Sequence, residues 1–284
     1  MVFLLACVGV LPTDDTSKDP ADTVDRTTLV CQVYGDLMAN HSEGTWSGNA
    51  ASCDAGDMDD AWRERALGAV NAYRVLADLP TVELDSSRNE MSQACALMMH
   101  ANNSLSHYPP QSWKCYTSDG ASAAGSSNIA TSAAVSAVDM YMQDWGNETT
   151  IGHRRWILSN QLGPIGVGST STYSCLYVIG GSGSAAKTWM AWPPPGPFPV
   201  LAAVDSTGWT IQSDSIDVSR ATPEVTADGV SLPMTVSTLE SGYGSTYAVK
   251  MIPDGWASTA GTTYHVEVPD TDIAYDVEMV DCNL

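Results

Sequence analysis

The sequence predicts an α+β protein, in which a first unit of helices and a few strands precedes a small all-β sandwich. Three observations predict this fold class. Apolar residues recur at helical spacing in the first part of the chain. A proline-rich run at 192–199 interrupts regular structure, and short alternating runs fill the remainder. The 284 residues suffice for two domains of ordinary size.

Apolar spacing predicts three helices in the first unit. They cover residues 59–79, 86–101 and 133–145, and Pro80 ends the first of them. A short buried strand is expected at 175–179, after a glycine-rich segment. The residues expected on the buried face of the first helix are Trp62, Ala66, Val70, Tyr73 and Leu76.

The second unit is predicted from short alternating runs separated by Gly, Asp, Ser and Pro, a pattern typical of an antiparallel sandwich. The runs are 209–211, 232–236, 247–251, 264–268 and 274–280. Proline fixes φ and lacks an amide donor, so we place the domain boundary in the proline-rich run. The predicted organisation is a signal remnant at 1–7, an acidic tether and disulfide-containing extension at 8–58, a first domain at 59–192, a proline-rich linker at 193–199 and a β-sandwich at 200–284.

The N-terminal segment resembles the end of a bacterial lipoprotein signal. Residues 1–6 are apolar and lead to Cys7, which would become the lipidated first residue. Residues 11–26 are rich in Asp, Thr and Pro, as expected of a solvated tether. The sequence contains no stretch of about 20 apolar residues, so membrane association is expected only through the lipid anchor. The expected location is extracytoplasmic, either secreted or lipid-anchored to the cell envelope.

The charge of the chain disfavours two classes of partner. The 12 basic and 33 acidic residues give a formal net charge of -21. A charge of this sign and size repels phosphate backbones and anionic lipid head groups. Nucleic acid is therefore not expected as a partner, and the function has to be sought in particular sites.

Six cysteines remain when Cys7 is set aside, and an even number suits three disulfides in an oxidising compartment. None of them has the spacing of a zinc finger. Spacing alone leaves many connectivities open. The pairing expected here is Cys31 with Cys53, Cys95 with Cys115, and Cys175 with Cys282.

Two of the five histidines fall inside short, sharply bounded motifs. His107 precedes a pair of prolines and is expected on a loop after the second helix. His153 follows a glycine and precedes an apolar anchor. Two histidines in one cleft can bind a metal ion or transfer protons. The adjacent Arg154 and Arg155 are expected to form salt bridges with nearby carboxylates in so acidic a chain.

Four motifs together resemble the CAP superfamily of cysteine-rich secretory proteins, antigen 5 and plant pathogenesis-related proteins, especially its bacterial members. Residues 71–74 resemble the N-x-x-R motif of the first helix, and 105–107 resemble the first histidine segment. Residues 127–130 resemble the E-N-I-A segment, and 152–158 resemble the G-H-R-x-x-I-L segment. The resemblance implies a CAP-like α-β-α sandwich, here followed by a small all-β, Ig-like sandwich.

In that family two histidines and two acidic residues line a cleft, and the resemblance assigns the histidines to His107 and His153. Ser127 stands where the family has the glutamate before Asn-Ile-Ala, and it is expected to hydrogen-bond an imidazole. The second acid falls nearest Asp144, with Glu148 in the inserted loop as the alternative. His107, His153 and Asp144 are then the candidate ligands for zinc or another divalent metal, the candidate cofactor.

Three functions remain open, because a fold does not determine a function. The leading one is binding of a lipid, glycan or protein ligand at the cell surface, with a metal on the two histidines as an optional aid. The second is metal-assisted hydrolysis of peptide or envelope polymer, with His107, His153, Asp144 and Glu148 as candidate catalytic residues. The third is a purely structural adhesion module. Binding is favoured over catalysis.

Overall fold

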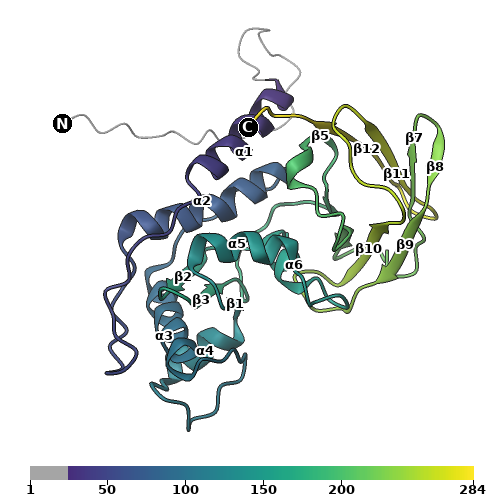
Figure 1. Ribbon diagram of the computed structural model, residues 1–284. Helices are drawn as coiled ribbons and strands as arrows, with labels where there is room; N and C mark the ends of the chain where they lie inside the picture. The colour runs from purple at the N-terminus through teal and green to yellow at the C-terminus, as the bar shows by residue number, and fades with distance from the viewer. Residues whose placement is uncertain (1–24) are drawn as a thin grey trace.

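The computed structural model describes residues 25–284, and its elements confirm the α+β class (Figure 1). Cys7, the signal remnant and most of the tether lie outside the described residues. The helices are α1 (Arg26–Ala39), α2 (Asp60–Leu76), α3 (Ser86–Asn102), α4 (Ser118–Gly125), α5 (Ala134–Gln143) and α6 (Gly152–Ile157), with a 3-10 turn η1 (Val200–Ala202). The strands are β1 (Ser127–Ala130), β2 (Gly166–Ser169), β3 (Ser174–Tyr177), β4 (Met190–Trp192), β5 (Gly196–Pro199), β6 (Trp209–Ser213), β7 (Glu224–Ala227), β8 (Val230–Leu232), β9 (Met234–Thr238), β10 (Tyr247–Pro253), β11 (Thr263–Val268) and β12 (Ile273–Val280). None of the helices in this range has the length and apolarity needed to cross a membrane.

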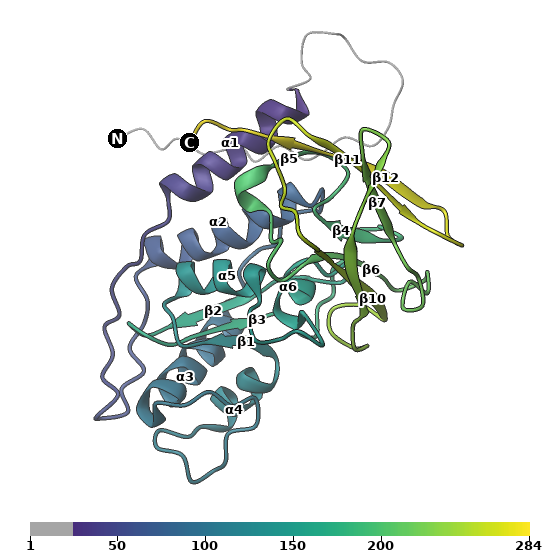
Figure 2. The ribbon, with the colours of Figure 1, turned by 45° about the vertical axis from the view of Figure 1, so that its right-hand side comes forward.

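The first unit is an α-β-α sandwich around a three-stranded antiparallel sheet in the order β1-β3-β2. Helices α3 and α4 cover one face of the sheet, and α2 and α5 lie on the other (Figure 2). Helix α2 begins after Asp59, whose carboxylate accepts a hydrogen bond from the backbone N of Trp62 at 2.8 Å. Such a cap satisfies an amide that the helix itself leaves free. The buried face of α2 contains the predicted apolar stripe.

The second unit consists of two sheets with the orders β4-β6-β10-β9 and β5-β12-β11-β7-β8. Side chains alternate strictly between buried and exposed along β11 and along most of β12, as the sequence pattern predicts for strands with one solvated face. Trp209 of β6 and Tyr264 of β11 meet edge to face, with ring centroids 5.5 Å apart. The two sheets therefore bury their inner faces against each other as a β-sandwich.

Trp192 joins the two units into one hydrophobic core. Its fully buried indole meets Tyr73 of α2 at a centroid distance of 5.7 Å and Phe198 of β5 at 4.8 Å. The same cluster extends from Trp62 in α2 to Met279 in β12. The units are thus packed together, and a site between them can be rigid.

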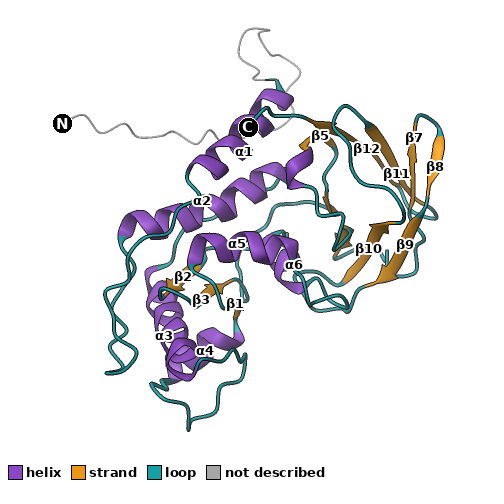
Figure 3. Ribbon diagram, viewed as in Figure 1, coloured by secondary structure: helices purple, strands orange, loops and turns teal. Residues whose placement is uncertain are grey.

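The proline-rich segment 193–199 is not only a linker. Residues Gly196–Pro199 form β5, which pairs in parallel with β12 at the edge of the five-stranded sheet. An edge strand needs a partner on one side only, so the missing proline amides cost it few hydrogen bonds. The sequence predicted a linker that forms neither helix nor central strand, and these four residues form an edge strand (Figure 3).

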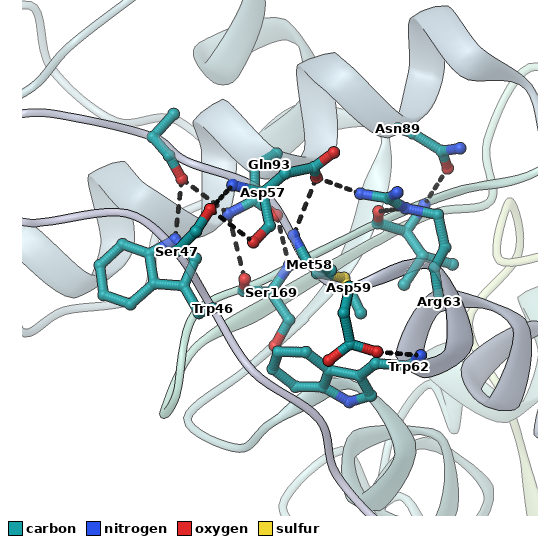
Figure 4. A network of polar contacts seen from close by, with 12 residues as sticks. Trp46, Ser47, Asp57, Met58, Asp59, Trp62, Arg63, Asn89, Gln93 and Ser169 are labelled. Atoms are coloured by element: carbon teal, nitrogen blue, oxygen red, sulfur yellow. Dashed lines mark hydrogen bonds and ion pairs between the residues drawn. The ribbon is translucent and has the colours of Figure 1, made fainter.

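Residues 25–58, expected to belong to a tether and extension, are folded onto the rest of the protein. Helix α1 packs against α2 and β5. The loop that follows α1 contains Ala55 and Asp57. Gln93 of α3 donates to the carbonyl oxygens of Ala55 at 3.1 Å and of Ser169 in β2 at 3.0 Å, and Arg63 of α2 pairs with Asp57 (Figure 4). These contacts tie the loop to α2, α3 and β2.

The expected disulfide pairing is wrong at all three bonds. The structure pairs Cys31 with Cys282, Cys53 with Cys115, and Cys95 with Cys175. Each bond joins segments that only the tertiary fold brings together, with sequence separations of 251, 62 and 80 residues. The cysteines of each expected pair lie on different elements and are not bonded to each other. Cys31, for example, lies on α1 beside the C-terminal end of the chain.

Candidate functional site

A cavity of about 400 Å³ has both motif histidines in its wall. The loop after α3 supplies His107, the short helix α6 supplies His153, and the loop between β9 and β10 supplies Tyr243. The other lining residues are Tyr108, Gly125, Ser127, Asn128, Gly146, Asn147, Glu148, Thr149, Thr150, Gly152, Trp156 and Ile179. A larger cavity of about 610 Å³ between α1 and α2 contains neither histidine. The structure thus brings together the two histidines that the sequence singles out.

Asp144 lies behind His153 and holds it in place. Its Oδ1 is 2.8 Å from His153 Nδ1, and its Oδ2 accepts from the backbone N of His153 at 2.9 Å and of Arg154 at 3.3 Å. Its side chain has no exposed surface, whereas 23% of the His153 side chain is exposed. Asp144 follows α5 directly and has a left-handed backbone with φ of 57°, which aims its carboxylate at the first turn of α6.

The hydrogen bonds assign the tautomer of His153. A carboxylate only accepts, so Nδ1 carries the hydrogen in the neutral ring and Nε2 carries the lone pair. Asn147 Nδ2 donates to Asp144 Oδ1 at 2.7 Å and also lies 3.1 Å from His153 Nδ1. Because both of those nitrogens then carry hydrogen, the carboxylate is the acceptor for each.

His107 is fixed in the same way by a different partner. Its Nδ1 lies 2.9 Å from the carbonyl oxygen of Ala124, at the end of α4. A carbonyl oxygen only accepts, so this ring also carries its hydrogen on Nδ1 when neutral. Neither Nε2 has a hydrogen-bond partner among residues 25–284. Both rings can therefore accept a hydrogen bond from a ligand.

Ser127 does not have the role expected for it. It is 2% exposed, and its Oγ has no hydrogen-bond partner in the described part of the chain. The tautomers of the two histidines are instead set by Asp144 and Ala124. The neighbouring Asn128 donates from Nδ2 to the carbonyl oxygen of His153 at 3.0 Å, while its buried Oδ1 has no protein partner in that part. Unpaired buried polar atoms of this kind usually meet water or a ligand.

The donor set does not fit a zinc site with three protein ligands. Both oxygens of Asp144 face Nδ1 of His153 and backbone amides, so they do not share a metal with a histidine Nε2. No group of three His, Cys, Asp or Glu side chains within residues 25–284 is placed to hold a metal ion. Catalytic zinc takes three protein ligands and an open position. We derive no chemistry through a metal.

Glu148 is the one acidic residue in the cavity wall. Its side chain is exposed, and its backbone carbonyl accepts from Nζ of Lys250 in β10 at 2.6 Å. It makes no hydrogen bond to either histidine among the contacts of the described chain. The two alternative candidates for the one expected acid therefore differ in place, with Asp144 buried behind one ring and Glu148 at the solvent edge.

Arg154 and Arg155 do not form the expected salt bridges. Both are buried and bind mainly backbone carbonyls that join α6 to the second unit. Arg154 Nη1 donates to Gly208 at 2.7 Å, and Arg155 Nη1 donates to Glu240 at 2.7 Å. Burial lowers the pKa of each guanidinium to about 10. Backbone carbonyls, and not carboxylates, accept the hydrogen bonds of these two guanidinium groups. A guanidinium has five N–H donors, so several fixed carbonyl oxygens can surround it.

Tyr243 is the site residue that the sequence analysis missed. It lies between Gly242 and Gly244 on a loop far along the chain, where no periodicity or motif marks it. A Cβ atom at Gly152 would lie 2.7 Å from Cδ1 of Tyr243, so this ring sits directly against the start of α6. Only the packing of the β-sandwich on α6 could reveal it.

Comparison with known proteins supports the resemblance for part of the chain. Residues 67–181 match the family model of CAP, described as the cysteine-rich secretory protein family. No curated protein and no solved structure matches the chain. The matched range contains the four motifs and both histidines and ends before β4, so the β-sandwich lies outside it. Residues 67–181 are thus similar to the CAP family, and Tyr243 comes to the site from beyond that likeness.

Proposed function

We propose that the protein is an exported binding module of the bacterial cell envelope whose ligand occupies the cavity between His107 and His153. The observation that carries this proposal is that the two imidazole rings have the same tautomer when neutral. Each donates its Nδ1 hydrogen within the protein, and each keeps Nε2 as an acceptor. Two fixed acceptors in one cavity wall support a site that selects its ligand by hydrogen bonds.

The wall favours a polar, uncharged ligand over a lipid tail. Hydroxyl and amide side chains from β1 and from the loop before α6 line much of it. A neutral imidazole Nε2 accepts from O–H or N–H groups, and these are abundant in glycans and peptides. The net charge of -21 disfavours anionic ligands.

Hydrolysis has less support than binding. A serine nucleophile needs a base within hydrogen-bond reach, and Ser127 Oγ bonds neither histidine. Residues 25–284 also do not supply a set of three metal ligands. A structural adhesion role would not require both rings to present Nε2 as an acceptor.

The three disulfides fit an extracellular or similarly oxidising compartment. We propose that export ends at the envelope, with Cys7 as the acylated anchor. Helix α1 begins at Arg26, and the residues between Cys7 and this helix would form the tether that the sequence predicts.

Calorimetric titration tests the proposed ligand site. The probes are chitotetraose, which is a neutral glycan, a terminally blocked alanine peptide without charged groups, and phosphatidylethanolamine vesicles. We expect the wild type to bind at least one of the two soluble probes, equally with EDTA or with added zinc. The His107→Ala, His153→Ala double variant should bind at least about 100-fold more weakly, because two buried hydrogen bonds are lost.

The matched control is His265→Ala. His265 pairs with Asp276 at 2.7 Å on the exposed face of the β-sandwich and does not line the cavity. We expect this variant to bind like the wild type, with circular dichroism confirming that all variants fold. Equal binding by the double variant, or binding of vesicles alone, would contradict the proposal.

A further inference from the structure

We infer that the ligand is a neutral oligosaccharide, and that the β-sandwich completes its site by supplying Tyr243 as a ligand-contacting wall. This inference rests on the proposed function and deepens it.

The loop carrying Tyr243 is fixed against the histidine motif. The backbone N of Glu240 donates to the carbonyl oxygen of Thr149 at 2.9 Å, across the two units. Gly244 has a φ of 70°, and a Cβ there would lie 2.2 Å from the carbonyl oxygen of Arg155. Only glycine allows that close approach with positive φ. Tyr243 is thereby pressed against Gly152 while 37% of its surface stays exposed.

Arg155 is the positioning residue of this wall. Its guanidinium donates to the carbonyl oxygen of Thr150 at 3.0 Å on one side of the cavity. On the other side it donates to the carbonyl oxygens of Glu240 at 2.7 Å and Ser245 at 3.1 Å. Arg155 is 1% exposed. One buried side chain thus links the loop before α6 to the loop that carries Tyr243.

The wall combines aromatic rings with hydrogen-bonding groups. Tyr108, Trp156 and Tyr243 line the cavity together with the two histidines, and none of the three aromatic residues is fully buried. A sugar ring has an apolar C–H face that can lie on an aromatic ring, and its hydroxyls point outward to polar partners. Aromatic lining with a few placed polar groups is the usual composition of a specific small-ligand site.

The ligand is expected to extend beyond one ring. Trp156 also borders a second cavity of about 400 Å³, lined in part by the 241–246 loop and by Asp214. A buried Oδ2 of Asp214 has no hydrogen-bond partner in the described chain. A hydroxyl group of a second sugar residue would satisfy such an acceptor. The shared tryptophan makes the two cavities neighbouring subsites.

The charge of the two cavities selects neutral sugars. Among residues 25–284, no lysine or arginine lines either cavity, whereas Glu148 lines the first and Asp214 the second. Anionic polysaccharides would therefore meet carboxylates without a compensating cation. The net charge of -21 acts in the same direction.

The test is calorimetric titration of the full-length protein with chito- and cello-oligosaccharides of one to six units. Oligogalacturonate serves as the anionic comparison. We expect the wild type to bind at least one neutral series, to bind tetramers about tenfold more tightly than monomers, and not to bind oligogalacturonate. Tyr243→Ala should weaken binding about tenfold or more, and Tyr243→Phe should stay within about threefold, because the ring is kept.

Trp145→Ala is the matched control. Trp145 is an aromatic residue that is 64% exposed, directly precedes Gly146 of the cavity wall and lines neither cavity. It should bind like the wild type. Asp214→Asn should weaken tetramer binding while leaving monomer binding unchanged. Arg155→Lys should resemble Tyr243→Ala in affinity while keeping the wild-type preference among sugars, because it acts through the loop.

The outcomes separate this inference from the proposed function. If the double histidine variant loses binding while Tyr243→Ala binds like the wild type, the inference fails and the proposed function stands. If the wild type binds the blocked, uncharged peptide but no neutral oligosaccharide, the saccharide class fails and the histidine site stands. If both sets of variants bind like the wild type, both proposals fail.

Discussion

The Nδ1 atom of His153 lies 2.8 Å from Oδ1 of Asp144, a carboxylate that has no exposed surface. The same carboxylate accepts from two backbone amides at the start of α6. Asp144 therefore does two things at once: it caps a six-residue helix and fixes the tautomer of the ring on that helix.

Asp144→Asn should invert the tautomer of His153. The amide oxygen of the new side chain is required by the backbone N–H groups of His153 and Arg154, so its NH₂ group faces His153 Nδ1. The ring then carries hydrogen on Nε2 and can no longer accept there. We expect ligand affinity to fall about tenfold. Nitrogen-15 NMR of the histidine rings measures the tautomer directly.

His107 is the internal control in the same spectrum, because its Nδ1 bonds Ala124 and not Asp144. Its tautomer should not change in the variant. An unchanged His153 signal in Asp144→Asn would show that the carboxylate does not set the ring.

Arg154→Lys should destabilise the junction between the two units. The guanidinium donates to the carbonyl oxygens of Met142 at 2.6 Å and Gly208 at 2.7 Å, and to Thr207 Oγ1 at 2.6 Å. A lysine ammonium cannot span these acceptors. We expect the free energy of unfolding to fall by about 2–4 kcal/mol, as measured by denaturant titration with tryptophan fluorescence. The exposed Arg220→Lys should change it by less than about 0.5 kcal/mol, and an equal loss in both variants would rule out the junction as the cause.

Local signals predicted α2, α3 and α5, whereas α1, α4, α6 and the tertiary links were not predicted. The stripe of α2, with its Asp59 cap and Pro80 beyond its end, is a property of consecutive residues, so the sequence contains it. Helix α1 carries the same signal in weaker form, with Asp25 as cap and Val30 and Tyr34 on its buried face. The information that specifies α1 is therefore also local in the sequence.

The candidate site divides in the same way. His107 and His153 could be identified because each stands in a short motif. The part played by Asp144 depends on a left-handed residue after α5, and that of Tyr243 on how one sandwich packs against the other. Neither leaves a periodic trace in the sequence. The disulfide pairing was predicted wrongly for the same reason, because all three bonds join segments that are distant along the chain.

Removing the bond between Cys31 and Cys282 should destabilise the protein strongly. This bond closes a loop of 251 residues and ties α1 to the end of the chain. Loop-closure entropy gives a loss of about 5 kcal/mol for the Cys31→Ser, Cys282→Ser double variant. The corresponding Cys53→Ser, Cys115→Ser variant should lose about 1 kcal/mol less, since its loop has 62 residues. Non-reducing peptide mapping checks the connectivity, and a peptide linking Cys31 to Cys53 would overturn it.

Glu43→Gln should reduce the loss of stability in acid. Burial opposes ionisation of Glu43, but hydrogen bonds from Ser136, Val135 and Trp62 outweigh it and lower the pKa of the carboxyl group. A lowered folded pKa stabilises the protein above the unfolded value, and this contribution is lost as pH falls through the folded pKa. The carboxylate is partly exposed, so the effect should stay below about 1 kcal/mol.

Urea titrations between pH 3 and about 7 measure this difference. Glu64→Gln is the control, because Glu64 is an exposed residue of α2 whose side chain makes no hydrogen bond in the described chain. An acid response of Glu43→Gln that matches both the wild type and Glu64→Gln would contradict the role of Glu43 at the start of α5.

Tyr275→Phe should stabilise the protein, most of all in alkali. The Tyr275 hydroxyl is buried without a hydrogen-bond partner in residues 25–284, so its removal should raise the free energy of unfolding by about 1 kcal/mol at pH 7. Burial also raises the pKa of Tyr275 above 10. Above pH 10 the unfolded chain ionises first, and wild-type stability falls by about 1.4 kcal/mol per pH unit for this group. The variant lacks that loss.

Tyr141→Phe separates the two effects, because Tyr141 is equally buried and burial raises its pKa too, but its hydroxyl lies 3.4 Å from Ser174 Oγ. It should show the same gain above pH 10 without the gain at pH 7, where a hydrogen bond is lost. Denaturant titrations at pH 7, 10 and 11 compare the two variants. A loss of stability at pH 7 in Tyr275→Phe would mean that a buried water pairs with the hydroxyl, because only a satisfied donor makes its removal unfavourable.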